Sequence, residues 1–481
     1  MSELKRSLNL FDTIMIVSGS MIGSGIFIVS ADMMRTLGSP FWVLMCWLIS
    51  GVITLFAALS YGELAGMMPK AGGQFIYIKR AYGNLTAFVY GWTVFTVIQT
   101  GVIAAVAVAF ARFVGVFIPV FDEKNSLLEV GKFTISSTQL LAVGSVLFLT
   151  YINTLGINNG KIIQRVFTSA KLLALLGLIF IGFFVGYKTG YWEKNIQLPF
   201  TGTGLISESS TSNFSITTLL SALGVALIGA LFSSDAWNNV TFIAGEVKEP
   251  QKNIPLGLLI GVLIVTVLYV LANVAYFMLL PALGSPEGQN VFEKGIAFAE
   301  NDRVGTAAMS AIFGTLSAYI MALLIIISTF GCNNGLILSG SRLFQSMAKE
   351  GLFFKSAAYI NKNHVPSKAL WFQAIWASVL CLSGSYGSLL DYCTFASLIF
   401  YIVTISALFY LRKKEPNTPR PYKAFGYPVL PALYILLASA ICIDLLIFKT
   451  LNTGLGVLIM FLGIPIFYIF KMHKNGQQFS E

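Results

Sequence analysis

Apolar stretches of about 20 residues recur along the whole chain and limit what it can fold into. The hydrocarbon core of a bilayer is about 30 Å thick, and an α-helix crosses it in about 20 residues. Of the 481 residues, 56% are hydrophobic and 11% are charged, and the mean hydropathy is +0.77. These values exclude a soluble globular protein. They predict an all-α polytopic membrane protein whose surroundings are the lipid bilayer.

Twelve of these stretches are predicted to span the membrane. Their approximate ranges are 10–36, 40–67, 84–118, 136–154, 163–187, 215–246, 255–281, 305–345, 369–386, 390–411, 427–448 and 452–471. The first stretch is not a cleaved signal peptide, because it lacks a cleavage site of the small-x-small type. The chain is therefore expected to keep all twelve.

Basic residues are divided unevenly between the two sides of the membrane. With the N-terminus inside, 21 Lys and Arg residues fall in cytoplasmic segments and 8 in outer segments, and Arg112 and Lys171 lie within spans. Cytoplasmic loops carry the excess of basic residues in membrane proteins. Both termini are therefore predicted to be cytoplasmic. The net charge of +10 is explained by orientation, and no nucleic-acid partner is expected.

Residues 17–27 interrupt the first stretch with Gly19, Gly23 and Gly25. Each glycine costs about 1 kcal/mol relative to alanine in a helix interior. Unpaired backbone groups in lipid cost several kcal/mol, so a broken helix persists only where protein or water covers it. The segment predicts either backbone groups that face a ligand or close helix packing through small residues.

The sixth stretch contains five polar side chains within an apolar helix. They are Ser233, Ser234, Asp235, Asn238 and Asn239. An aspartate near a helix centre costs about 3 kcal/mol on insertion scales, so it usually faces protein or water and marks a functional site. The cluster predicts a second break. The alternative is that the polar side chains form hydrogen bonds between helices.

The two breaks fall at corresponding positions of two five-helix halves. Such a pair is typical of inverted-repeat transporters, which bind substrate near the bilayer midplane. We expect a first repeat over residues 1–187, a second over 188–411, and a cytoplasmic connector with two trailing helices over 412–481. A helix N-terminus attracts a carboxylate, and unwound carbonyls accept an ammonium group. An α-amino acid carries both groups.

Lys171 lies inside the fifth stretch. A lysine within a span needs a partner or a wet cavity. We expect Lys171 to act as a fixed internal cation that takes the place of a sodium ion and ties the fifth span to the first break. The alternative is that its side chain extends to the cytoplasmic surface, which is only about two helical turns away.

The sequence offers no catalytic or metal-binding constellation. Its two histidines, His364 and His473, lie in polar segments, and none of the five cysteines forms a C-x-x-C pair. The cysteines therefore support neither a disulfide framework nor a metal site. No pairing of a nucleophile with a base is visible. We expect no metal, no cofactor and no enzymatic activity.

Short motifs are spread over nearly the whole chain. They are Gly23-Ser24-Gly25-Ile26-Phe27; Glu63 with Pro69, Gly72, Gly73 and Tyr77; Ala170-Lys171; Phe232 with Asp235, Trp237 and Asn238; Glu246 with Pro250, Asn253, Ile254 and Pro255; Asn334-Gly335 with Ser341-Arg342; and Arg420-Pro421-Tyr422-Lys423 with Pro428 and Pro431. No single motif is specific, but the set is. The chain resembles the amino acid–polyamine–organocation superfamily, and most closely its L-type amino acid transporter branch.

The resemblance implies a LeuT-type fold of twelve transmembrane helices, with two inverted five-helix repeats, discontinuous helices 1 and 6, and two trailing helices. It implies sodium-independent transport of L-amino acids across the plasma membrane by alternating access, with neutral amino acids exchanged one for one. The implied site residues are the N–H groups of Ser24, Gly25 and Ile26 for the carboxylate; the carbonyls of Met21, Ile22, Phe232, Ser233 and Asp235 for the ammonium group; Phe232 as the outer gate; and Lys171 in place of sodium.

The chain also departs from the family pattern. Residues 233–237 read Ser-Ser-Asp-Ala-Trp where many relatives have a tyrosine and a glycine pair, so this segment is expected to alter side-chain selectivity. Candidates for the pocket wall are Trp237, Asn238, Thr394 and Phe395. The outer loop of residues 119–135 lacks the cysteine that links animal relatives to a glycoprotein heavy chain. No covalent heavy-chain partner is expected, which with the short termini suggests a prokaryotic inner-membrane protein.

Two other functions remain open on the sequence. One is a proton-coupled amino acid symporter, in which Lys171 or Asp235 takes up and releases the proton, since burial can shift the pKa of either group. The other is an amino acid sensor that binds without transporting. The first predicts uptake driven by a proton gradient, and the second predicts binding without flux.

Overall fold

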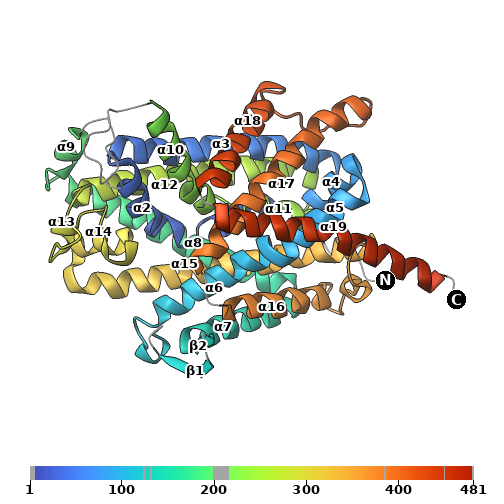
Figure 1. The fold of residues 1–481 in the computed structure, drawn as a ribbon, viewed down its shortest axis with the longest axis horizontal. Helices are drawn as coiled ribbons and strands as arrows, with labels where there is room; N and C mark the ends of the chain where they lie inside the picture. Colours follow the sequence, from blue (N-terminus) through green and yellow to red (C-terminus); the bar gives the residue numbers. More distant parts are fainter. Residues whose placement is uncertain are drawn as a thin grey trace.

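The computed structural model describes residues 6–122, 125–130, 133–198, 216–383, 386–448 and 450–478. The described chain is mostly α-helical, and its longest helices run side by side along the long axis of the molecule (Figure 1). One antiparallel hairpin, β1 (Ser126–Val130) with β2 (Phe133–Ser136), lies in the predicted outer loop. The all-α prediction therefore holds apart from this hairpin.

The first half of the chain contains one broken span and one span that continues through a π-helical turn. The helices are α1 (Leu10–Met21), η1 (Gly25–Phe27), α2 (Val29–Leu37), α3 (Pro40–Met67), α4 (Gln74–Tyr82), α5 (Asn84–Thr93), η2 (Val94–Ile98), α6 (Gln99–Val114), η3 (Pro119–Phe121), α7 (Ser137–Thr154), α8 (Ile157–Gly186) and α9 (Tyr191–Ile196). The first stretch is broken between α1 and α2, whereas α5 and α6 are joined by the single π-helical turn η2.

The second half repeats the pattern of one broken helix followed by long ones. Its helices are α10 (Ile216–Ser233), α11 (Asn239–Phe242), η4 (Ala244–Glu246), α12 (Pro250–Leu279), α13 (Val291–Lys294), η5 (Glu300–Asp302), α14 (Val304–Phe313), η6 (Gly314–Leu316), α15 (Ser317–Lys349), η7 (Lys355–Ala358), α16 (Ser367–Leu382), α17 (Tyr386–Lys414), α18 (Val429–Phe448) and α19 (Thr450–Gln478).

Seven segments of the described chain are long and apolar enough to cross a bilayer. They are Pro40–Met67, Asn84–Val114, Ile157–Gly186, Pro250–Leu279, Val304–Lys349, Cys393–Lys414 and Val429–Ile447. Four shorter apolar helices accompany them: Leu10–Met21, Thr218–Ser233, Ser367–Leu382 and Gly456–Lys471. The chain is thus a polytopic helical membrane protein. The count of twelve spans stays a prediction, because α7 falls in neither set.

The predicted eighth span, residues 305–345, is not one helix. It is divided at Gly314, whose φ of +58° lies in the left-handed region, so that α14 ends at Phe313 and α15 begins at Ser317. A glycine adopts this conformation without the penalty that a β-carbon brings. The helix then continues to Lys349, past the predicted end.

The segments predicted to lie on opposite sides of the membrane are found at opposite ends of the molecule. In Figure 1, α9 and α13, which belong to predicted outer segments, lie at the left end. The helix α4 and the far end of α19, which belong to predicted cytoplasmic segments, lie at the right. This separation agrees with the predicted topology, while which end faces the cytoplasm stays a prediction.

Candidate functional site

The first break begins where α1 ends, at Met21. The next residue, Ile22, has extended backbone angles (φ −76°, ψ 98°), and a single 3₁₀ turn, Gly25–Phe27, precedes α2. The last carbonyls of an α-helix have no donor within the helix. A break inside the protein therefore needs donors from elsewhere.

Lys171 supplies two of these hydrogen bonds. Its side chain is 3% exposed, and Nζ donates to the carbonyl oxygens of Gly19 and Ile22, the latter at 2.7 Å. Nζ is also 3.5 Å from the carbonyl oxygen of Ser328 on α15. The amine thus points at the break and links α8, α1 and α15. The side chain therefore does not extend to the protein surface, which was the alternative interpretation of the sequence.

Two further donors come from α15. The Ser328 hydroxyl lies 3.1 Å from the carbonyl oxygens of both Ile22 and Gly23. The Cys332 thiol donates to the carbonyl oxygen of Ser20 at 3.1 Å. Side chains of α8 and α15 therefore donate hydrogen bonds to several backbone carbonyl oxygens at the end of α1. Each carbonyl oxygen has two lone pairs, so one donor does not exhaust its capacity.

The three glycines of the first break have different surroundings. A β-carbon at Gly19 would lie 2.2 Å from Gln164 Nε2, which means that Gly19 allows α1 to pack closely on α8. At Gly25 it would lie 2.1 Å from Ser233 Oγ, whereas at Gly23 the nearest atom would be Cys332 Sγ at 3.9 Å. Gly19 thus serves the close packing of helices. Gly25 instead lies where the first break contacts the second.

The second break separates α10, which ends at Ser233, from α11, which begins at Asn239. Ala236 has a φ of +65°, a left-handed conformation that costs an L-residue about 1 kcal/mol. The Asp235 carboxylate accepts hydrogen bonds from the hydroxyl of Tyr401 at 2.5 Å and from that of Ser397 at 3.5 Å. Both partners belong to α17, so Asp235 links the second break to that helix.

Three small cavities meet at Asp235. The first, of about 30 Å³, lies between the breaks and is lined by Met21, Ser24, Gly25, Phe232 and Ser233 among others. The other two, of about 20 Å³ each, lie toward α4 and α5 and toward α3 and α18. Each is large enough for only about one or two water molecules. Among the predicted binding residues, Ile22 and Ile26 are fully buried and do not line the first cavity.

The predicted pocket-wall residues fall in different places. Trp237 and Thr394 line the cavity toward α3, and Asn238 lines the one toward α4. Trp237 is also packed against the rings of Tyr61 and Tyr401, with centroids 4.7 and 5.2 Å apart. Phe395 is buried and lines none of the three cavities. These four residues therefore do not form one wall.

Two neighbours of Asp235, Ser397 and Tyr401, were not predicted from the sequence. A signal for them exists, because Thr394, Ser397 and Tyr401 are spaced by three and four residues along α17. Residues at this spacing share one face of a helix. A polar stripe of this kind in an apolar helix marks a face turned toward protein or water.

Several motif residues without a predicted role form ion pairs. Glu246 and Arg342 are both 0% exposed, and two guanidinium nitrogens lie 3.0 Å from the two carboxylate oxygens. Buried Glu63 binds Arg412 and Arg420, with a closest distance of 2.5 Å to Arg412. Two-point pairs of this type fix the geometry as well as the charge.

A third ion pair joins the N-terminal end of α1 to α8. The buried carboxylate of Asp12 lies 2.5 Å from Arg165 Nε and 3.5 Å from Lys161 Nζ. In all three groups the carboxylate belongs to α1, α3 or the segment after α11, and its cation belongs to α8, α15, α17 or the connector after α17. Ion pairs thus connect the two sets of helices.

Several known transporters are similar in sequence to this chain over nearly its whole length. The serine/threonine exchanger SteT of Bacillus subtilis (strain 168) is 29% identical over 474 residues, which cover 98% of each chain. The b(0,+)-type amino acid transporter 1 of Mus musculus is 28% identical over 477 residues, covering 99% of this chain and 90% of that protein. The large neutral amino acids transporter small subunit 2 of Homo sapiens is 29% identical over 487 residues, covering 98% and 82%.

A family model decides the assignment. Residues 8–470, from the start of α1 almost to the end of α19, match the amino acid permease family. The match includes both breaks, Lys171 and the three ion-pair groups. The chain therefore belongs to the amino acid permease family, within the L-type branch of the amino acid–polyamine–organocation superfamily.

Proposed function

We propose that the chain is a sodium-independent exchanger of neutral L-amino acids that works by alternating access across the cell membrane. The observation that carries this proposal is the position of the Lys171 amine on the carbonyls of Gly19 and Ile22. A fixed ammonium group there places a positive charge on the carbonyl oxygens of a broken helix, as a bound sodium ion would. Transport then needs no sodium.

In this proposal the substrate binds between the two breaks. The N–H groups of Ser24, Gly25 and Ile26 receive its carboxylate, since they start a helical segment whose first N–H groups have no acceptor within the helix. The carbonyls at the ends of α1 and α10, including those of Met21 and Ser233, receive its ammonium group. Phe232 lines the cavity and closes the site from outside.

Alternating access requires the cytoplasmic ion pairs to separate. Asp12, Glu63 and Glu246 lie on one set of helices and their cations on the other, so opening toward the cytoplasm pulls the two sets apart. We place this event in a twelve-helix LeuT-type topology with two inverted repeats, residues 1–187 and 188–411, and with both termini in the cytoplasm. Rocking of one set against the other exposes the site to each side in turn.

The names of the relatives support exchange and neutral substrates. The Bacillus subtilis protein is called a serine/threonine exchanger, and the human protein a transporter of large neutral amino acids. Those two classes differ in side-chain size. We therefore propose the neutral class as a whole, and a competition panel of the twenty amino acids against one labelled substrate identifies its members.

The test uses purified protein in liposomes without sodium. Uptake of a labelled amino acid should require unlabelled amino acid inside the vesicles. Uptake into empty vesicles driven by an inward proton gradient would instead show a symporter. That alternative has one supporting observation, the Asp235 carboxylate that bonds to Tyr401 at the meeting point of three cavities. Binding without flux would show a sensor.

A further inference from the structure

A cavity of about 400 Å³ lies at the predicted outer end of the molecule. Its walls are formed by α13, η5, α14, η6 and the start of α15, which surround the bend at Gly314 (Figure 1). Cavities that bind small molecules usually measure about 300–1,000 Å³. The three cavities at Asp235 measure only about 20 to 30 Å³. The outer cavity therefore has room for an organic molecule, whereas those at Asp235 have room only for water.

Three hydroxyl groups that line this cavity lack hydrogen-bond partners. They belong to Thr306 and Ser310 on α14 and to Ser317, the first residue of α15, and none of them makes a hydrogen bond within the described residues. A hydroxyl in a helix can donate to the carbonyl oxygen four residues earlier, as that of Thr404 does to Phe400. Ser317 is only 3% exposed, and a buried polar group without a partner is costly. These hydroxyls therefore need a partner inside the cavity.

Two basic side chains give the cavity a positive charge. Lys294 at the end of α13 and Arg303 just before α14 both line it, and the Arg303 guanidinium carbon lies 4.8 Å from the centre of the Phe113 ring. Glu300 also lines the cavity, but its carboxylate is 3.9 Å from Lys294 Nζ, beyond hydrogen-bond distance, and its side chain is 79% exposed. Solvent screens such an exposed charge. The described lining residues thus carry a net charge of +1, which a single negative charge complements.

The chemistry of the lining indicates the class of molecule that it binds. The apolar members of the lining are small or few: Val291, Ala299, Ala307 and Ala318. The other groups are hydroxyls, amides and charged side chains, which favour a ligand that is polar throughout. An ammonium group brings three donors, and each hydroxyl donates once and also accepts. A carboxylate satisfies Lys294, and hydroxyl groups of the ligand satisfy Thr306, Ser310 and Ser317.

The wall of the cavity also contacts the first broken helix. A β-carbon at Gly305 would lie 2.9 Å from Cδ1 of Phe27, so α14 packs directly on η1. Asp302, which precedes the lining residue Arg303, pairs with Arg35 of α2 at 2.6 Å. Both segments that follow the first break, η1 and α2, are therefore attached to the elements that enclose the cavity.

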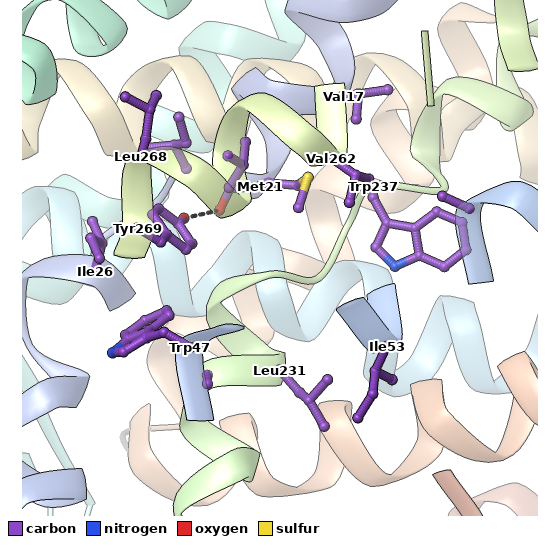
Figure 2. Packing of buried hydrophobic residues seen from close by; sticks show 14 of the residues in the cluster. Val17, Met21, Ile26, Trp47, Ile53, Leu231, Trp237, Val262, Leu268 and Tyr269 are labelled. Atoms are coloured by element: carbon purple, nitrogen blue, oxygen red, sulfur yellow. Dashed lines mark hydrogen bonds between the residues drawn. The ribbon is translucent and has the colours of Figure 1, made fainter. Parts of the chain in front are cut away.

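The turn η1 is also fixed in the apolar core. Figure 2 shows Ile26 of η1 among the same buried side chains as Trp47 of α3 and Tyr269 of α12. Opening of the site toward the outside requires η1 and α2 to move against this core and against α14. A ligand that connects α13, α14 and α15 stabilises their present arrangement, because it binds that arrangement better than an opened one. Occupancy of the cavity therefore opposes outward opening.

We propose that the outer cavity binds a small hydroxylated monocarboxylate, the chemical class of the sugar acids, and that its occupancy slows amino acid exchange. The site is separate from the substrate site, since its walls are α13, α14 and the start of α15. The binding itself is independent of the proposed function. The effect on exchange rests on that function.

Binding is tested with D-gluconate, which carries one carboxylate and a hydroxyl on every other carbon. It has no α-ammonium group, so it does not match the site between the breaks. Sorbitol is the uncharged counterpart. Equilibrium binding to the purified protein at constant ionic strength should saturate with D-gluconate and not with sorbitol. Lys294→Ala should weaken D-gluconate binding at least about tenfold, and Thr306→Val about threefold. Lys188→Ala, at an exposed lysine just beyond α8, is the control and should bind as the wild type does.

The effect on function is tested by exchange in liposomes with D-gluconate on both sides of the membrane. At saturation it should slow wild-type exchange about fivefold. Lys294→Ala should exchange as the wild type does without D-gluconate, and D-gluconate should leave its rate unchanged.

Four results would overturn the proposal: no saturable binding of D-gluconate, equal binding of sorbitol, unchanged affinity in Lys294→Ala, or wild-type exchange that D-gluconate does not slow. A wild-type protein that binds D-gluconate but exchanges no amino acid would refute the proposed function and support the assignment of the cavity. The two failures are therefore distinguishable.

Discussion

The two helix breaks are held by different kinds of contact. At the first, side chains from α8 and α15, including Lys171 and Ser328, donate to backbone carbonyls. At the second, the side chain of Asp235 makes the link, to Tyr401 on α17. At the first break the contacted groups are therefore backbone carbonyls, which every residue type has. At the second break the contact depends on one particular side chain, that of Asp235. We infer that the first recognises what all amino acids share and the second selects among side chains.

The largest effect should come from removing the amine at the first break. Lys171→Ala removes hydrogen bonds from a charged donor to two carbonyls, and each such bond contributes about 2 kcal/mol. We expect exchange in liposomes to fall at least about a hundredfold, with expression unchanged. Lys188→Ala, at an exposed lysine just beyond α8, is the control and should exchange normally. Unchanged kinetics in Lys171→Ala would remove this lysine from the mechanism.

The contact between the breaks can be disturbed by a single methyl group. Gly25→Ala places a β-carbon 2.1 Å from Ser233 Oγ, so one break must move, and we expect substrate affinity to fall about a hundredfold. Gly23→Ala is the matched control. Its β-carbon has no neighbour closer than 3.9 Å, so the loss should stay within about tenfold. Equal affinities of the two variants for a labelled amino acid would contradict the assignment of Gly25.

Changes at the second break should alter selectivity more than rate. Asp235→Asn keeps the shape but removes the charge that Tyr401 and Ser397 bind. We expect the order of competing amino acids to change, with individual affinities shifting about tenfold while exchange continues. Tyr401→Phe should shift them in the same direction by less. A uniform loss for all amino acids, as at the first break, would erase the distinction between the two breaks.

The smallest effect should come from relieving backbone strain. Ala236 has a φ of +65°, which glycine adopts without penalty. Ala236→Gly should therefore raise the free energy of unfolding by up to about 1 kcal/mol, visible as a higher midpoint of thermal unfolding, while selectivity stays close to wild type. A lower midpoint would show that the methyl group contributes packing that outweighs the strain.

The sequence reveals the breaks because their residues are out of place in an apolar helix. Gly23, Gly25 and Asp235 are costly there, so their presence predicts a site. Lys171 is visible for the same reason. The structure then places each of them beside a residue that lies far away in sequence, such as Ser233 for Gly25.

Tyr269 and Gly314 show what the sequence alone did not reveal. A tyrosine in a long apolar helix is ordinary, and the bond from Tyr269 to Met21 joins residues 248 apart in the chain. Gly314 is one of many glycines, and only its φ of +58° distinguishes it. Side-chain contacts over such separations depend on how the helices pack, which no local pattern encodes.

The central claim is that the two breaks form one amino acid site in which Lys171 replaces sodium. Equilibrium binding of a transported amino acid to the purified protein, with and without sodium, tests it most directly. We predict one substrate per wild-type chain, with a Kd that sodium leaves unchanged, and strongly weakened binding to Lys171→Ala. Wild-type binding that requires sodium, or undiminished affinity in Lys171→Ala, would contradict the claim.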